Sequence, residues 1–342
     1  MSERLSDYDE ALLAAEYELE AGTSLVRRGN GNGALPAPLD LAEAQAEEAI
    51  SRGRVDLSGA PRWRWPTLDR RIGRMMPGQL VIVGALMGNG KTAFLMSQMD
   101  WMAAQEIGTL YIPLEINPED LRRQWAAWRL GLDWEYVARN EWDELPDGTQ
   151  EMHEMEIARL AMSPHIQFPP ERRIDINDLG RWIAWGVKEF QARCVVIDHF
   201  HRMSFGENAN AYRIVVSETA RALKDLAREF KITIIASAQL NRSNAHPLLD
   251  RYAPPSIDRL KESSAMAEEA DVVLMLSRRL KTAPKRAELD AIRLGHKSER
   301  DFADPDVMCV TCRKHRLSDK AAGDRSTLLR VVDGHVLESL TD

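Results

Sequence analysis

The sequence predicts an α/β protein in which a mostly parallel central sheet carries helices on both faces, preceded by a short helical extension. Two observations predict this class. Apolar runs of strand length alternate with stretches of helical periodicity, which is typical of parallel strands joined by crossover helices. The glycine-rich segment 84–90 joins one such run directly to one such helix. The expected strands are 81–83, 108–115, 165–168, 194–198, 231–237, 271–276, 306–312 and 326–332.

The expected helices lie between these strands. They cover 93–102, a stretch beginning near Pro118, 178–191 and 214–230. Acidic residues just after Pro118 suit the first turn of a helix. The last three strands have no helical stretch between them, so they are expected to extend the sheet in antiparallel fashion.

The length of 342 residues suggests one large domain with an appendage, or two domains. Residues 1–38 are expected to form an acidic helix and a flexible linker. Residues 39–60 are expected to form a helix that docks on its own domain or on a neighbouring subunit, and 61–342 to form the large domain. The net charge is −8, of which residues 1–52 contribute −7. The near-neutral remainder does not exclude nucleic-acid binding.

Three cysteines, Cys194, Cys309 and Cys312, are too few for a disulfide framework. Cys309 and Cys312 have the spacing of metal ligands, but no second pair accompanies them, and residues three apart on a strand point to opposite faces. We therefore interpret them as structural. No stretch reaches the length of a transmembrane helix, and the N-terminus lacks an apolar signal core. The protein is expected in the cytoplasm, without a membrane partner.

The segment 85–92 reads Ala-Leu-Met-Gly-Asn-Gly-Lys-Thr. Gly88 and Gly90 allow the backbone angles that aim successive N–H groups at one anion, and the start of the helix adds partial positive charge. Lys91 can reach the β- and γ-phosphates of a nucleotide, and the Thr92 hydroxyl can bind Mg²⁺. A chance turn is a poor alternative, because strand and helix flank the motif as nucleotide binding requires. The residues expected to contact the nucleotide are Ala85, Gly88, Asn89, Gly90, Lys91, Thr92 and Ala93.

Three further polar side chains, Glu115, Asp198 and Gln239, stand at the ends of predicted strands. Because the carboxyl ends of parallel strands meet at one edge of a sheet, we expect them beside the phosphate loop. Asp198 can hold Mg²⁺, Glu115 can accept the proton of an attacking water, and Gln239 can sense the γ-phosphate. Each alone has an ordinary explanation as a surface residue. Together they predict nucleotide hydrolysis.

These motifs resemble, in order, those of the C-terminal motor domain of replicative hexameric DNA helicases of the DnaB type, a branch of the RecA fold. The loop 85–92 carries that family's alanine at its first position. The segment 114–118 (Leu-Glu-Ile-Asn-Pro) resembles the family's catalytic-glutamate motif. The pair 197–198 (Ile-Asp) resembles its Mg²⁺-binding strand, and 237–242 resembles its sensor stretch. The resemblance covers roughly residues 63–335.

The resemblance also implies roles for two later segments. Residues 260–271 resemble the family's DNA-contacting loop and the strand after it. Lys314 and Arg316 resemble a Lys-x-Arg pair that reaches the nucleotide of a neighbouring subunit, and period-two spacing places both side chains on one face of a strand. The implied DNA-binding residues are Arg242, Arg259, Lys261, Glu262 and Ser264. The implied catalytic residues are Lys91, Glu115, Gln239, Lys314 and Arg316, with Thr92 and Asp198 on the metal.

Three features depart from the family. Lys261 stands where an arginine is expected, and Leu317-Ser318 replace the usual glycine after the Lys-x-Arg pair. Residues 1–55 are too short for the family's N-terminal domain, which contacts primase, and this shortening favours a phage or mobile-element helicase.

The resemblance implies a ring-forming, ATP- and Mg²⁺-dependent DNA helicase that acts on single-stranded DNA during replication, with a hexameric ring and a loader or primase as expected partners. A DNA-binding ATPase of the same fold without unwinding activity remains the alternative: a recombination mediator, a helicase-loading factor or a regulatory ATPase.

Overall fold

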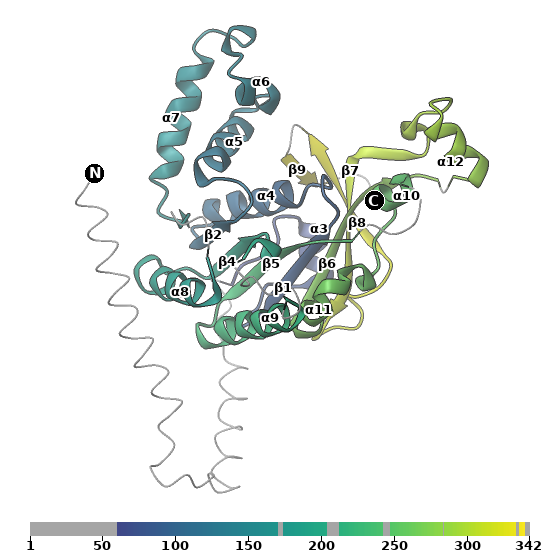
Figure 1. Cartoon of the computed structure of the whole chain (residues 1–342). Coiled ribbons are helices and arrows are strands. Elements are labelled where there is room, and N and C mark those ends of the chain that lie inside the picture. The colour runs from purple at the N-terminus through teal and green to yellow at the C-terminus, as the bar shows by residue number, and fades with distance from the viewer. Residues whose placement is uncertain are drawn as a thin grey trace, which may run out of the picture.

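The computed structural model describes residues 60–169, 174–203, 212–241, 247–282, 284–332 and 335–338 (Figure 1). The acidic helix and linker expected over 1–38 lie outside this part of the chain, as do the helix expected over 39–60, apart from residue 60, and Arg242. The side chains of residues 261–265 also lie outside it.

Nine strands of the described chain form one sheet in the order β3-β2-β4-β5-β1-β6-β7-β8-β9. Neighbouring strands run parallel from β3 to β6 and antiparallel from β6 to β9. The predicted parallel sheet and its antiparallel extension are both confirmed. The strands are β1 (Leu80–Ala85), β2 (Thr109–Pro113), β3 (Ile166–Gln167), β4 (Cys194–Asp198), β5 (Thr233–Gln239), β6 (Val272–Leu280), β7 (Ala303–His315), β8 (Ser326–Val332) and β9 (His335–Glu338).

Helices cover both faces of the sheet, as predicted (Figure 1). Alternate residues of β1 divide between two hydrophobic clusters, because successive side chains of a strand point to opposite faces. Val81 and Val83 pack with α3, α4 and α5, whereas Leu80 and Ile82 pack with α8, α9 and α11. The helices are α3 (Pro66–Ile72), α4 (Lys91–Ala104), α5 (Pro118–Leu130), α6 (Trp134–Arg139), α7 (Thr149–Ala161), α8 (Ile176–Phe190), α9 (Tyr212–Glu229), α10 (Pro247–Tyr252), α11 (Ser264–Glu269) and α12 (Arg286–Arg293).

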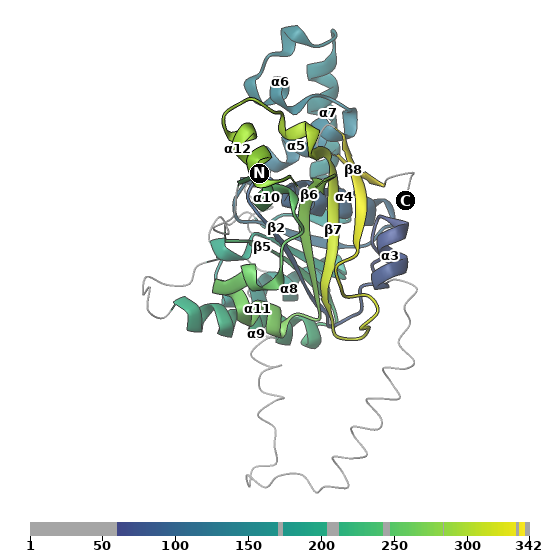
Figure 2. The ribbon, with the colours of Figure 1, turned by 90° about the vertical axis from the view of Figure 1, so that its right-hand side faces the viewer.

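Several elements differ from the sequence-based expectation. The strand expected over 165–168 is only the two-residue β3. The segment 241–264, where no helix or strand was expected, contains α10 and a 3₁₀ turn, Ile257–Ser263. Helices α3, α6, α7, α11 and α12 were not predicted. Four of them have only 6 to 8 residues, too few to establish a helical period in the sequence, and most residues of α7 are exposed. In Figures 1 and 2, α6 and α7 project away from the sheet, whereas α5 packs into the same core cluster as α4. Figure 2 shows β7 and β8 at the front.

The three cysteines are buried and unlinked, as expected. Burial raises the pKa of Cys194 to about 12 and those of Cys309 and Cys312 to about 11, so the thiols stay protonated at neutral pH. Within the described residues, no group of three or more His, Cys, Asp and Glu side chains is placed to hold a metal ion. The interpretation of Cys309 and Cys312 as structural agrees with this burial.

Candidate nucleotide-binding site

The phosphate loop follows β1 and ends at the first turn of α4. Gly88 and Gly90 have φ angles of 80° and 87°, which confirms that the turn needs left-handed backbone at both positions. A side chain at Gly90 would also lie 2.9 Å from Met308 Cε and 3.2 Å from Arg278 Nη2. As in any helix, the first N–H groups of α4 have no partner within the helix, and α4 begins directly after the loop, as anion binding requires.

Lys91 begins α4 and is 9% exposed. Its Nζ lies 3.4 Å from the carbonyl oxygen of Ala85, the last residue of β1. Burial lowers the pKa of Lys91, while the nearby Asp198 and Glu115 carboxylates oppose that shift. The ammonium group is therefore held inside the loop, close to two acidic groups of the same site.

Asp198 at the end of β4 accepts three hydroxyl hydrogen bonds. Thr92 Oγ1 and Tyr111 OH donate to its Oδ2 at 2.8 and 3.0 Å, and Ser237 Oγ donates to its Oδ1 at 2.6 Å. Burial raises the pKa of Tyr111 well above its usual value, so this phenol remains a donor. Thr92 and Asp198 thus present adjacent oxygen atoms, the ligand chemistry that Mg²⁺ prefers. Their fit to Mg²⁺ rests on this donor set.

Glu115 lies two residues beyond β2, with its side chain 43% exposed. Its Oε2 is 3.4 Å from Nε2 of His199, which is 4% exposed. Burial is the main cause of the lowered pKa of His199, opposed by Glu115 and Asp198, so the imidazole is neutral at neutral pH. His199 therefore orients Glu115 without a full ion pair. Gln239 ends β5, opposite Ala85 in the ladder, with an exposed side chain.

Arg278 on β6 was missed by the sequence analysis. Its Nε and Nη1 are buried and have no hydrogen-bond partner in the described part of the chain, and the same holds for Asn89 Oδ1. Asn89 Nδ2 donates to Arg251 O at 3.1 Å, which ties the phosphate loop to α10. Burial lowers the pKa of Arg278, with Arg251 as the second cause. A half-buried cation with two buried, unpaired donor nitrogens beside Gly90 fits a site that takes an anion.

We call the end of the sheet at which the parallel strands have their carboxyl ends, and where the phosphate loop lies, the phosphate edge. The opposite end, at which the parallel strands begin, is called the finger edge, after the Lys-x-Arg pair expected to reach a neighbouring nucleotide. Lys314 and Arg316 lie at the finger edge, because β7 runs antiparallel to β6 and pairs His315 with Val272 at the start of β6. The phosphate loop follows the other end of β1, roughly 17 Å away at about 3.3 Å per residue. The fold therefore separates these two predicted residues from the rest of the site.

The prediction that Lys314 and Arg316 share one face is confirmed. Lys314 Nζ and Arg316 Nη2 both donate to the carbonyl oxygen of Glu268 near the end of α11. A register shift leaves Arg313 without a counterpart on β6, and its guanidinium instead donates to the carbonyl of Pro255. These contacts keep the Arg313 guanidinium apart from Lys314 and Arg316, which both contact Glu268.

The predicted DNA-contacting residues are described only in part. Arg259 forms a buried ion pair with Asp250, so its charge is already compensated within the chain. Lys261 and Glu262 belong to the 3₁₀ turn that leads into Ser264, the first residue of α11, but their side chains lie outside the described atoms.

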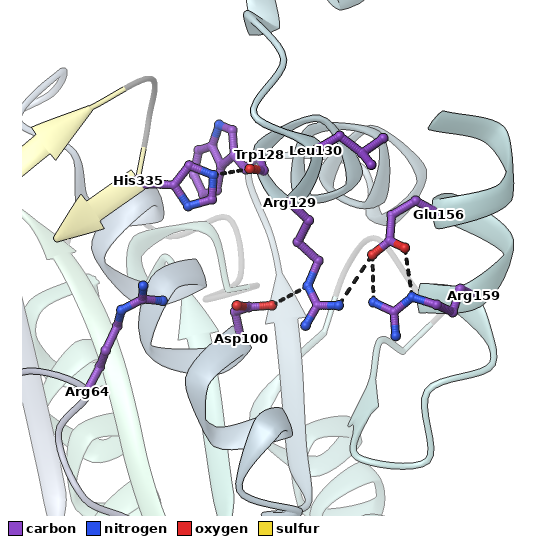
Figure 3. A pocket seen from close by; sticks show the side chains of 8 residues that line it. All are labelled: Arg64, Asp100, Trp128, Arg129, Leu130, Glu156, Arg159 and His335. Carbon is purple, nitrogen blue, oxygen red and sulfur yellow. Dashed lines mark hydrogen bonds and ion pairs between the residues drawn. The ribbon is translucent and has the colours of Figure 1, made fainter. Parts of the chain in front are cut away.

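A separate hollow of about 390 Å³ lies among α4, α5, α7 and β9 (Figure 3). Arg129 contacts Asp100 at 2.6 Å and Glu156 at 3.3 Å, and Arg159 pairs with the same Glu156. Asp100 is nine residues beyond Lys91 on α4, roughly 14 Å away at about 1.5 Å per residue. The hollow is thus no part of the nucleotide site.

Among the helices of the described residues, none has the length and apolar character that a membrane span requires.

The fold and the site define a phosphate-loop nucleotide-binding domain of the RecA-like type. Residues 64–318 match the DnaB-like helicase C terminal domain, and the chain belongs to that family. It is 25% identical over 260 residues to the replicative DNA helicase DnaB of Leifsonia xyli, covering 73% of this chain and 54% of that protein. The DnaB of Helicobacter pylori is also 25% identical, over 81% of this chain and 54% of its own length.

The chain thus spans about half the length of these curated relatives. Two solved structures share the fold. One is a separate ATPase domain, which superposes with a TM-score of 0.67 at 19% identity and covers 89% of this chain and 100% of its own. The other is a DnaB-like replicative helicase studied with primase, which superposes with a TM-score of 0.68 at 17% identity, over 99% of this chain and 76% of its own.

Proposed function

We propose that this chain is the motor of a replicative DNA helicase that assembles as a ring, hydrolyses ATP with Mg²⁺ and translocates on single-stranded DNA to unwind the duplex. The observation that carries the proposal is the separation of charges between two edges of one sheet. One edge holds a phosphate loop with Lys91, Glu115 and Asp198. The other holds a pair of cations that cannot reach that loop within the chain.

At the phosphate edge, each residue has a distinct task. Backbone N–H groups of the loop and Lys91 hold the β- and γ-phosphates, and Arg278 supplies a further positive charge. Glu115, oriented by His199, accepts the proton of the attacking water. Thr92 and Asp198 would hold Mg²⁺, which when bound neutralises part of the phosphate charge. Gln239 pairs with Ala85 on the neighbouring strand and contacts the γ-phosphate in this proposal.

At the finger edge, Lys314 and Arg316 complete a site on another copy of the chain. A head-to-tail interface of this kind brings different surfaces of identical chains together and closes into a ring when the rotation allows it. The hexameric number, the loader or primase partner and the phage origin stay predictions from the sequence.

Single-stranded DNA is proposed to contact the segment from Asn241 to Ser264. Its 3₁₀ turn Ile257–Ser263 and the start of α11 present backbone N–H groups, which bind phosphates without reading sequence. Arg242 and Lys261 supply charge, whereas the ion pair with Asp250 leaves Arg259 a smaller part than expected.

Mixing two inactive variants tests the proposal. Arg316→Ala should bind ATP and assemble, yet hydrolyse about 10³–10⁵-fold more slowly, the range for a lost arginine finger. Lys91→Ala should be inactive because its phosphate loop is incomplete. Mixtures should recover activity, because some interfaces pair an intact loop with an intact finger. Arg330→Ala, at an exposed position on β8, is the matched control and should keep its activity.

Co-assembled mixtures that stay inactive would contradict a finger acting between copies. A strand-displacement assay on the wild-type protein then separates a helicase from a DNA-binding ATPase. DNA-stimulated hydrolysis without strand displacement would support that alternative.

A further inference from the structure

Asp271 lies directly before β6 and ties three parts of the chain together at the finger edge. Its Oδ2 accepts hydrogen bonds from Leu80 N at 2.8 Å and from Lys224 Nζ at 2.5 Å. Lys224, on α9, also donates to Gly78 O at 2.6 Å. Asp271 and Lys224 are 8% and 5% exposed. A carboxylate this buried needs compensating partners, and these contacts fix its position firmly.

The other carboxylate oxygen of Asp271 faces Arg316. Oδ1 lies 3.8 Å from Arg316 Nη1, and the backbone oxygen of Asp271 accepts a hydrogen bond from Arg316 N at 2.8 Å. On its other side, Arg316 Nη2 donates to Glu268 O. Lys314 Nζ donates to the same carbonyl at 2.8 Å and to Ala267 O at 2.6 Å. Two cations at the C-terminal end of α11 match the negative end of its dipole.

A catalytic arginine must be held in one geometry to be effective. A free arginine side chain samples many rotamers, and a misplacement of about 1 Å costs on the order of 10²-fold in rate. Asp271 is the carboxylate nearest Arg316 in the described chain, and it is itself fixed by β1 and α9. It therefore offers a rigid support for a flexible side chain.

We propose that Asp271, held in place by Lys224, is a positioning residue that aims Arg316 at the nucleotide of the neighbouring copy. This inference rests on the proposed function, in which Arg316 acts between copies. A competing explanation exists, because Asp271 also contacts Leu80 at the start of β1, the strand that leads to the phosphate loop of its own chain. In the first explanation an Asp271 variant lacks a working finger. In the competing explanation it lacks a working phosphate loop.

Asp271→Asn separates them, because the amide keeps an acceptor for Leu80 N but loses the charge that faces Arg316. We expect kcat to fall about 10- to 100-fold, as for a misplaced catalytic group, with KM for ATP within about twofold. Mixed with Lys91→Ala, Asp271→Asn should regain activity, since its phosphate loop is intact. Mixed with Arg316→Ala it should gain no activity over the separate variants, since neither variant supplies a correctly positioned finger.

The reverse pattern, with recovery only in the Arg316→Ala mixture, would place Asp271 with the phosphate loop and overturn the inference. Full activity of Asp271→Asn would overturn it as well. Full activity of Arg316→Ala would contradict the proposed function instead, so the two failures are distinguishable.

A second variant covers the case in which Asp271→Asn does not fold. Lys224→Met removes the other cation from Asp271 and frees the carboxylate to shift toward Arg316. In the mixing assay it should recover activity with Lys91→Ala but not with Arg316→Ala. Recovery with Arg316→Ala would overturn the inference. Asp100→Asn is the matched control, because Asp100 lines the separate hollow, where it pairs with Arg129, and its loss should leave kcat unchanged.

Discussion

The phosphate edge and the finger edge of the sheet hold their charged groups in different ways. At the phosphate edge, side chains hold one another: Asp198 is fixed by three hydroxyl groups, and Glu115 by His199. At the finger edge, backbone carbonyls of α11 hold Lys314 and Arg316, and one carboxylate supports them. The first arrangement is complete within one chain. The second holds two cations that, in the proposed function, act on the nucleotide of another copy.

One sheet serves both sites because two of its central strands run from one edge to the other. β1 and β6 are parallel neighbours and connect the two edges directly. Asp271 and Leu80 exchange hydrogen bonds at one end, and Arg278 lies beside Gly90 at the other. A shift of β6 against β1 would therefore move groups at both edges together. The following changes test this division, in order of decreasing effect.

Glu115→Gln tests whether the phosphate edge separates nucleotide binding from chemistry. The amide cannot accept the proton of water, so kcat should fall about 10²–10⁴-fold, the usual contribution of a general base. ATP affinity should stay within about threefold, because the phosphate contacts are unchanged. Steady-state kinetics and equilibrium binding measure the two quantities. Glu119→Gln, at an exposed position in the first turn of α5, is the control. Near-normal turnover by Glu115→Gln would remove Glu115 from this role.

Arg278→Met tests whether the unpaired cation of Arg278 lowers the stability of the free protein and strengthens its binding of nucleotide. Each buried unsatisfied group costs about 1–3 kcal/mol, so the variant should be more stable than the wild type without nucleotide. Its affinity for an ATP analogue should fall about tenfold, because a charge-assisted contact is lost. Thermal unfolding with and without the analogue measures both effects. Arg279→Met changes the next residue, which is exposed, and should alter neither the stability nor the affinity for the analogue. A destabilised Arg278→Met with normal affinity would show that the arginine is structural.

Lys261→Ala tests whether the segment entering α11 contacts DNA. One lost phosphate contact should lower the log–log salt slope of single-strand binding by roughly 0.7. Fluorescence anisotropy at several salt concentrations measures the slope. Lys320→Ala, at an exposed position far along the chain, should leave it unchanged. Equal affinity and slope for Lys261→Ala and the wild type would exclude this contact.

Much of the phosphate edge was predictable because its signals are local. The strand, glycine turn, Lys91 and Thr92 are contiguous, and the turn demands left-handed backbone at Gly88 and Gly90. The placement of Asp198 at a strand end followed from an apolar run and the rule for parallel sheets. Tyr111, His199 and Arg278 gave no such signal. Tyr111 reaches Asp198 across 87 residues, and nothing in its own neighbourhood marks it as a hydrogen-bond donor to a site.

The linear pattern of residues is enough to predict which segments the proposed chemistry uses: the phosphate loop, the carboxylates at strand ends, and the shared face of Lys314 and Arg316, which is expected from the period of a strand. The position of these last two at the edge opposite the loop depends instead on the folded chain. It requires the antiparallel pairing of β7 with β6 and the place of β6 beside β1. Strand order is set by packing between segments far apart in the chain, so no local pattern records it. The same packing buried Asp271 between Lys224 and Arg316.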